Sequence, residues 1–505
     1  MKKLLLFTFF ITTLLNLNAQ EVEDAGKSGA KKPAIYIQVK ADSVVSKHEL
    51  IVKGQHINYK AVAGTDPLLD EDGKSIATVF YTYYERTDVS NRNNRPLIIS
   101  FNGGPGSASV WMHIAYTGPV LLNIDDEGYP VQPYGTKPNA NSLLDMADIV
   151  FIDPVNTGFS RISNKETPKS KFFGVNADIK YLAEWLNSFV GHYNRWTSPK
   201  FLIGESYGTT RVSGLALELQ NAQWMYLNGV ILVSPTFLGM EREGAVADAT
   251  RLPYFAATAW YHKMLPARLQ QKDLTEMLPE VENFTMNELI PALAKGSMLD
   301  NAARNDIATK MAMYSGLPVK SILAHNLLIS TNFFWKELLR DKGYTLGRLD
   351  SRYLGIDAQE AGEGPDYNAE LTSWLHSFTP AINAYLRQDL NYKTDLKYNM
   401  FGPVHPWDNS NDNTGANLRQ AMAQNPYLHL LIQSGYYDGS ICDYFDAKYS
   451  MWHLDPSGKM NNRMSWKGYR SGHMMYLRKD DLVTATDDLR VFIKDALPKD
   501  KPAKY

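Results

Sequence analysis

The chain has 505 residues, and its formal net charge of −2 gives no support to binding of nucleic acid or of an anionic membrane. Its hydrophobic content of 44% is ordinary for a globular protein and sufficient for a large core, which can be one α/β core with an insertion. Because Cys442 is the single cysteine and the eleven histidines are scattered without an H-E-x-x-H pattern, an internal disulfide and a cysteine-type zinc site are excluded, and no metal site is expected.

The N-terminus predicts export. Residues 1–3 are basic and are followed by an apolar run, "LLLFTFFITTLL", that has the length of a secretory signal and is too short to span a membrane comfortably. Cleavage is expected near Ala19, so residues 1–19 are interpreted as a signal peptide and the polar residues 20–33 as a linker. No later stretch predicts a transmembrane helix. A bacterial enzyme that is periplasmic or secreted fits this pattern best.

The next elements predict an α/β protein. Residues 48–62 and 76–87 alternate like the strands of an antiparallel hairpin. Buried strands are then expected at 95–104, 147–154, 200–204 and 227–235, with amphipathic helices at 176–193 and directly after Ser206. Strands that alternate with helices favour a mostly parallel central sheet with helices on both faces.

This alternation stops between residues 240 and 420. That region contains helical stretches, such as 282–298 and 379–390, and no buried strand of the earlier kind. Strand patterns return at 427–439 and 464–475, before a final helix at 487–497. The simplest organisation is an α/β core built from residues 34–239 and 421–505, with a helical insertion at 240–420 that caps the site at the carboxyl ends of the strands.

A nucleophile elbow is the first chemical hypothesis. "LIGESYGTT", residues 202–210, contains G-x-S-x-G between the expected strand and helix. In such a turn the glycines relieve crowding and the serine oxygen, here that of Ser206, is lifted to the carboxyl edge of the sheet. The motif also arises by chance, and the alternative is a glycine-rich loop with a surface serine.

An elbow serine requires a base and an orienting acid, which in this fold follow in the order Ser, acid, His. Asp438 lies just after the strand pattern at 427–439, and His473 lies close to the final helix. Taken singly, Asp438 could be a turn residue, Asp443 is a rival acid, and His473 could be structural. Their joint placement favours a Ser206–Asp438–His473 triad.

An oxyanion hole is expected from two backbone amides, one of them from the residue after the nucleophile, Tyr207. The loop "FNGGPGSAS", residues 101–109, would supply the other, because its glycines let the backbone approach a substrate closely. A phosphate-binding loop is the alternative, but the Lys-Ser/Thr ending of such loops is absent.

Five segments in this order, "FNGGPGSASVW", "FIDPVNTGFS", "LIGESYGTTR", "SGYYDG" and "SGHM", resemble the serine carboxypeptidases of the α/β-hydrolase fold over roughly residues 45–495. The resemblance implies that Ser206, Asp438 and His473 are catalytic and that Gly104 and Tyr207 form the oxyanion hole. It also implies that Asn102, Gly103 and Glu205 bind the C-terminal carboxylate of a peptide. Two carboxylates attract only when one holds a proton, so Glu205 would act in its protonated form. The alternative for Glu205 is a buried structural acid.

Several positions depart from the family pattern. Tyr116 stands where the family usually has a Glu that shares a proton with the elbow Glu, so the preference for acidic pH could be weak or absent. Ser107 replaces a family cysteine, the segment 151–160 is one residue short, and "GTTR" follows the elbow in place of the common Ala-Gly-x-Tyr.

We therefore expect an exported hydrolase that removes C-terminal residues from peptides through an acyl-enzyme, without a cofactor. An esterase or acyltransferase on the same triad is one alternative, and a non-catalytic peptide-binding protein is another. Side-chain preference, physiological substrate and oligomeric state do not follow from the sequence.

Overall fold

The computed structural model describes residues 42–410, 412–497 and 502. The predicted signal peptide at 1–19 and linker at 20–33 lie outside the described residues. None of the helices in the described part is long and apolar enough to cross a membrane.

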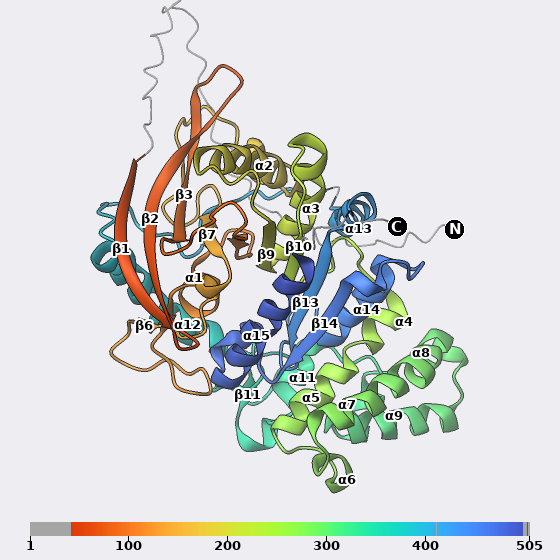
Figure 1. Cartoon of the computed structure of the whole chain (residues 1–505). Helices are drawn as coiled ribbons and strands as arrows, with labels where there is room; N and C mark the ends of the chain where they lie inside the picture. The colour runs from red at the N-terminus through yellow and green to blue at the C-terminus, as the bar shows by residue number, and fades with distance from the viewer. Residues whose placement is uncertain (1–41, 411, 498–501, 503–505) are drawn as a thin grey trace, which may run out of the picture. The chain divides into compact units, whose positions relative to one another are not determined.

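Ten strands of the described chain form one sheet, in the order β1-β2-β3-β7-β4-β9-β10-β13-β14, with β8 beside β3 (Figure 1). Pairing is antiparallel from β1 to β7 and parallel from β7 to β14. The expected mostly parallel α/β sheet is thus confirmed. The strands are β1 (Asp42–Val52), β2 (Gln55–Leu69), β3 (Ser75–Arg86), β4 (Leu97–Phe101), β7 (Asp148–Asp153), β8 (Arg161–Ile162), β9 (Lys200–Ser206), β10 (Gly229–Pro235), β13 (His429–Gly435) and β14 (Met464–Tyr469).

Helices cover both faces of the sheet (Figure 1). Successive side chains of a strand point to opposite faces, so Ile98 of β4 packs into one hydrophobic core and Ile99 into the other. The first core is completed by α1 (Val110–Ala115), α12 (Ala369–Ala384) and α15 (Lys479–Ala496). The second is completed by α2 (Val175–His192), α3 (Tyr207–Ala222), α13 (Thr414–Gln424) and part of α14 (Tyr444–Leu454).

The prediction of a single strand over residues 48–62 is wrong. Lys53 and Gly54 have φ angles of 48° and 81°, and they form the turn of a β1–β2 hairpin. Two consecutive residues in the left-handed region are what a tight hairpin turn requires. The burial pattern changes phase at this turn, from Leu50 and Val52 to Ile57 and Tyr59, which a reading of one continuous alternation overlooks.

Most helices between residues 240 and 340 share a third hydrophobic core, and Figure 1 shows them gathered together. They are α4 (Gly244–Ala249), α5 (Leu252–Tyr261), α6 (Ala267–Gln270), α7 (Leu274–Phe284), α8 (Ile290–Lys295), α9 (Asn301–Ser315), α10 (Val319–Ala324) and α11 (Thr331–Glu337). The ends of the predicted insertion, at 240 and 420, stay predictions. Two helices within this range pack beside the central sheet instead, α12 against α1 and α13 against α3.

Short pairs of strands lie outside the main sheet. β11 (Thr345–Leu346) and β12 (Leu354–Gly355) pair within the region where no strand was expected. β5 (Val120–Leu122) and β6 (Thr136–Pro138) form a second small ladder. Strands of two or three residues are too short to produce a recognisable alternation in the sequence.

Candidate active site

Ser206 occupies a sharp turn between β9 and α3. Its φ and ψ are 57° and −129°, a strained conformation for a residue with a side chain. A Cβ atom on Gly204 would lie 2.1 Å from the carbonyl oxygen of Gly208, and one on Gly208 would lie 2.7 Å from that of Phe101. Both glycines are therefore needed for the chain to make the turn, which has the form of a nucleophile elbow.

An aspartate and a histidine meet at the same edge of the sheet. Asp438 follows β13 and His473 follows β14, and the His473 Nδ1 atom lies 2.7 Å from Asp438 Oδ2. Both side chains are buried. Although burial by itself lowers the pKa of His473, the attraction and hydrogen bond of Asp438 outweigh it and raise this pKa above its ordinary value. The imidazole is thus held with Nδ1 toward the carboxylate.

The backbone of His473 is fixed by two other segments. Its amide donates to the carbonyl of Leu349 at 2.6 Å, and its carbonyl accepts from the Ser234 hydroxyl at 2.7 Å. β10, which carries Ser234, pairs with both β9 and β13. The contact with Ser234 therefore connects the histidine loop to the strand that ends at Ser206 and to the strand that Asp438 follows.

The rival acid, Asp443, has another role. Its carboxylate is the N-cap of α14, accepting from the amides of Phe445 at 2.9 Å and of Asp446 at 3.0 Å. A side chain used in this way satisfies the free amides of a helix end. The structure therefore pairs His473 with Asp438.

Within the described residues, the Ser206 hydroxyl makes no hydrogen bond to His473. Catalytic hydrogen bonds are often long in the absence of substrate and tighten only in the complex. The structure thus brings Asp438 and His473 together and places Ser206 at the carboxyl end of the adjacent part of the sheet, with β10 between β9 and β13.

The glycine-rich loop after β4 lies directly against the elbow. A Cβ atom on Gly103 would be 2.4 Å from the amide nitrogen of Tyr207, so the two backbones are in contact. Gly104 has a φ of 106°, which favours glycine, and the Ser107 amide donates to the Gly103 carbonyl at 2.9 Å. Gly103, Gly104 and Tyr207 are thus gathered beside Ser206, as an oxyanion hole would require.

The sequence analysis did not single out Arg211, whose side chain supports the glycine-rich loop after β4. Its fully buried guanidinium donates to the carbonyls of Asn102 at 2.7 Å and Pro105 at 3.3 Å. It also pairs with the buried Asp178 of α2 at 2.7 Å. The available signal was the departure "GTTR", which puts an arginine near the start of α3 at the position where the family pattern Ala-Gly-x-Tyr has a tyrosine.

Glu205 lies in a buried hydrogen-bond network next to the elbow. Asn102 Nδ2 donates to Glu205 Oε1 at 3.0 Å, and the Tyr476 hydroxyl donates to Glu205 Oε2. Burial raises the pKa of Glu205 to about 7, while the nearby His473 and these two donors act in the opposite direction. Glu205 can therefore gain or lose its proton close to neutral pH.

A cavity of about 460 Å³ borders the Asp438–His473 pair. Gly439 and Ser440 line it, and the Ser440 hydroxyl is 3.4 Å from His473 Nδ1. The opposite wall comes from the helical region and includes Arg251, Trp335 and Arg348. Ser206, Asp438 and His473 do not themselves line this cavity.

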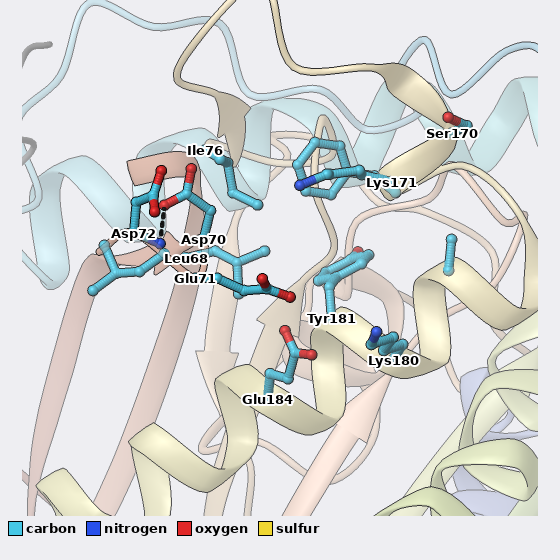
Figure 2. A pocket seen from close by; sticks show the side chains of 13 residues that line it. Leu68, Asp70, Glu71, Asp72, Ile76, Ser170, Lys171, Lys180, Tyr181 and Glu184 are labelled. Atoms are coloured by element: carbon cyan, nitrogen blue, oxygen red, sulfur yellow. Dashed lines mark hydrogen bonds between the residues drawn. The ribbon is translucent and has the colours of Figure 1, made fainter. Parts of the chain in front are cut away.

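A larger cavity, of about 700 Å³, lies elsewhere, between the β2–β3 turn and α2. Figure 2 shows Glu71 and Glu184 extending into it, with Lys180 and Tyr181 nearby. None of the residues proposed for the site lines it. Within residues 42–410 and 412–497, no three His, Cys, Asp or Glu side chains gather into a set that could hold a metal ion.

The sequence model of the family described as serine carboxypeptidase matches residues 55–436, which is more than half of the chain. The chain belongs to the serine carboxypeptidase family. Pheromone-processing carboxypeptidase KEX1 of Saccharomyces cerevisiae is 31% identical over 155 residues, covering 29% of this chain and 20% of the relative. Serine carboxypeptidase-like 8 of Arabidopsis thaliana is 28% identical over 185 residues, covering 35% of this chain and 40% of the relative. The matched part therefore spans less than half the length of these relatives.

A solved structure supports the fold of this serine carboxypeptidase family member. The crystal structure of Kex1Δp, a prohormone-processing carboxypeptidase from Saccharomyces cerevisiae, aligns with a TM-score of 0.51 and 18% identity. The alignment covers 86% of this chain and 91% of that chain. At this identity the likeness establishes the α/β-hydrolase fold.

Tyr116, where the resemblance led us to expect a Glu, lies beside the ring of Tyr476. Its ring stacks on that of Tyr476, with centroids 4.6 Å apart and planes 10° apart, and its hydroxyl donates to Gln433 Oε1 at 2.7 Å. The hydroxyl that reaches Glu205 is therefore that of Tyr476, while Tyr116 supports the ring that carries it.

Proposed function

We propose that the chain is a serine-type carboxypeptidase that hydrolyses the last peptide bond of peptides through an acyl-enzyme. The observation that carries this proposal is the Asp438–His473 pair beside the elbow of Ser206, with the Asn102–Glu205 pair on the other side of the same turn. The first pair would supply the base for the Ser206 nucleophile. The Asn102–Glu205 pair would supply hydrogen-bond donors for the C-terminal carboxylate of the substrate.

In the first half of the reaction, Ser206 Oγ attacks the scissile carbonyl carbon and its proton passes to His473 Nε2. Asp438 orients the ring and stabilises the resulting imidazolium. The amides of Gly104 and Tyr207 donate to the oxyanion. When the carbon–nitrogen bond breaks, the leaving amine takes the proton from His473, and the acylated Ser206 remains.

In the second half, a water molecule replaces the amine. His473 removes its proton, the hydroxide adds to the acyl carbon, and the collapse of this intermediate returns the proton to Ser206 Oγ. The products are the released amino acid and the peptide shortened by one residue. Apart from the peptide and one water molecule, these steps use only side chains and backbone amides of the chain.

Recognition of the free carboxylate is assigned to Asn102, the Gly103 amide and protonated Glu205. Asn102 is well positioned for this, since its Oδ1 accepts from the Met112 amide at 3.2 Å and its side chain cannot rotate without losing that bond. Asn102 Nδ2 donates to Glu205 Oε1, and Asn102 also forms a side-chain hydrogen bond with Tyr476, so a substrate carboxylate would take the place of one of these partners.

The helical region at 240–420 would cap the site. The connection between β11 and β12 supports this, because it contacts both loops of the Asp438–His473 pair. The Arg348 carbonyl accepts from the Gly439 amide at 3.0 Å, and the Leu349 carbonyl accepts from the His473 amide at 2.6 Å. Export to the periplasm or the medium, based on residues 1–19, is part of the same proposal.

The test compares an N-blocked dipeptide with its C-terminal amide. The purified protein should release the last residue from the free acid much faster than it cleaves the amide. Asn102→Ala should remove this preference, and Ser206→Ala should abolish both activities. An enzyme that cleaves an N-blocked amino acid ester well and shows no preference for the free acid would instead be an esterase or acyltransferase. A protein whose Ser206 is not labelled by a fluorophosphonate would contradict any serine-enzyme role.

A further inference from the structure

We propose that Tyr476 is a positioning residue for Glu205, and that its hydroxyl sets the pH range in which the enzyme accepts a free C-terminal carboxylate. This inference rests on the proposed function, since it assigns Glu205 to substrate recognition. Tyr476 itself is three residues after His473, in a single turn of 3₁₀ helix, η8 (Met475–Leu477).

The ring of Tyr476 is held so that its hydroxyl can point in one direction only. The side chain is fully buried and stacks on Tyr116. Tyr116 is fixed in turn by Gln433 of β13, and the Gln433 amide nitrogen donates to the Tyr469 hydroxyl at 2.7 Å. The stacking of the two rings fixes the plane of the Tyr476 ring, and its hydroxyl donates to Glu205 Oε2.

Each oxygen of Glu205 therefore receives a donor, Asn102 on one side and Tyr476 on the other. Donors of this kind stabilise the ionised carboxylate, whereas burial stabilises the neutral form. The other titratable groups that act on Glu205 are His473, which favours its ionised form, and Asp438, which favours its neutral form. The phenol of Tyr116 stays neutral because burial raises its pKa well above the ordinary value.

The balance between the neutral and the ionised form of Glu205 determines how well the substrate binds. Protonated Glu205 can donate to the substrate carboxylate, and ionised Glu205 repels it. With a pKa of about 7, Glu205 would lose its proton as the pH rises through neutrality, and KM for free-acid peptides would increase. Tyr476 lowers the pH at which this happens, so removal of its hydroxyl should extend binding to higher pH.

The central experiment is the pH profile of kcat/KM for Tyr476→Phe and the wild-type protein. Loss of a hydrogen bond to a charged group should move the alkaline limb for a free-acid dipeptide upward by about one to two pH units. The change should lie in KM, with kcat unaltered. With an N-blocked amino acid ethyl ester, which has no free carboxylate, the two profiles should coincide.

Tyr116→Phe is the matched control. It removes one buried hydroxyl from the same stacked pair but leaves the hydroxyl that reaches Glu205, so its alkaline limb should stay in place. An unchanged limb in Tyr476→Phe, or an equal shift in Tyr116→Phe, would overturn the proposal.

A second variant keeps the test valid if Tyr476→Phe does not fold. Site-specific incorporation of 3-fluorotyrosine at position 476 keeps the shape of the ring and makes the hydroxyl a stronger donor. The alkaline limb should then move to lower pH, and a shift upward or no shift would contradict the role of this hydroxyl. Labelling by a fluorophosphonate and ester hydrolysis report on the triad separately, so failure of the proposed function would be visible before these profiles are compared.

Discussion

Replacement of Arg211 by methionine tests how the glycine-rich loop is supported. The guanidinium is fully buried and joins three parts of the site: α3, the carboxylate of Asp178 on α2, and the carbonyls of Asn102 and Pro105. Methionine has a similar length and can occupy the space, but it carries no charge and no donors. Asp178 would then keep only the hydroxyl of Tyr181, at 3.0 Å.

The loss of stability in Arg211→Met comes from the carboxylate of Asp178, which stays buried without its charged partner. Removing one partner of a buried ion pair typically destabilises a protein by about 3–5 kcal/mol. Burial already raises the pKa of Asp178, and Arg211 opposes that effect, so the pKa in the variant would be higher still. A carboxyl whose pKa is higher in the folded than in the unfolded state loses stability as the pH rises from the unfolded pKa through the folded one. The deficit of the variant should therefore be larger at pH 8 than at pH 5.

Urea denaturation at both pH values measures these quantities. Arg268→Met is the control, because it breaks an ion pair with Glu280 in which the arginine is 54% exposed, and such pairs contribute at most about 1 kcal/mol. Adding Asp178→Asn to Arg211→Met should recover part of the stability and remove the pH dependence. A loss below about 1 kcal/mol for Arg211→Met, or a deficit that is the same at pH 5 and pH 8, would refute the reasoning.

Other residues give shorter tests. Asp438→Asn should reduce kcat by about 10⁴-fold with little change in KM, because the amide no longer fixes the tautomer of His473; a loss below tenfold in steady-state assays would contradict this assignment. Gly204→Ala should destabilise the fold by about 2 kcal/mol or more, since the new Cβ would meet a backbone oxygen at 2.1 Å, and an unchanged thermal midpoint would show that the elbow is less crowded. Arg348→Gln should raise the pKa of His473, which Arg348 lowers, and so move the acidic limb of kcat/KM for an ester upward; a downward shift would exclude this effect.

The parts of the molecule that were predictable are those with local signals. Several of the parallel strands contain a short apolar run, as within Leu97–Phe101 and Asp148–Asp153, and the fold class followed from their alternation with helices. The position rules of the fold then selected Asp438 and His473, which the structure places in hydrogen-bond contact. Their catalytic roles remain proposals that the experiments above test.

The parts that were not predictable depend on contacts between distant segments. The hydroxyl of Tyr476 meets Glu205 across 271 positions of sequence, and although the elbow motif marks Glu205, no local pattern marks Tyr476 as its partner. Arg211 was visible as an unusual residue, but its role depends on α2 and on the glycine-rich loop, which only the folded chain brings together. Side-chain chemistry of this kind follows from packing, whereas periodicity reports only which face of an element is buried.

The tyrosine pair beside Glu205 also determines what the pH profile should look like. Two carboxyls that share a proton titrate as a coupled pair, whereas Glu205 has beside it two buried tyrosines with pKa values well above 10. Apart from His473, whose loss of a proton activates the triad, Glu205 is the group at the carboxylate-binding position that loses a proton around pH 7. Once His473 is also deprotonated, kcat/KM for a free-acid dipeptide should fall tenfold per pH unit, the slope of a single ionisation, and the fall should be absent for an ester. A hundredfold decrease per pH unit would show that a second group titrates with Glu205, and that the tyrosine pair does not isolate it.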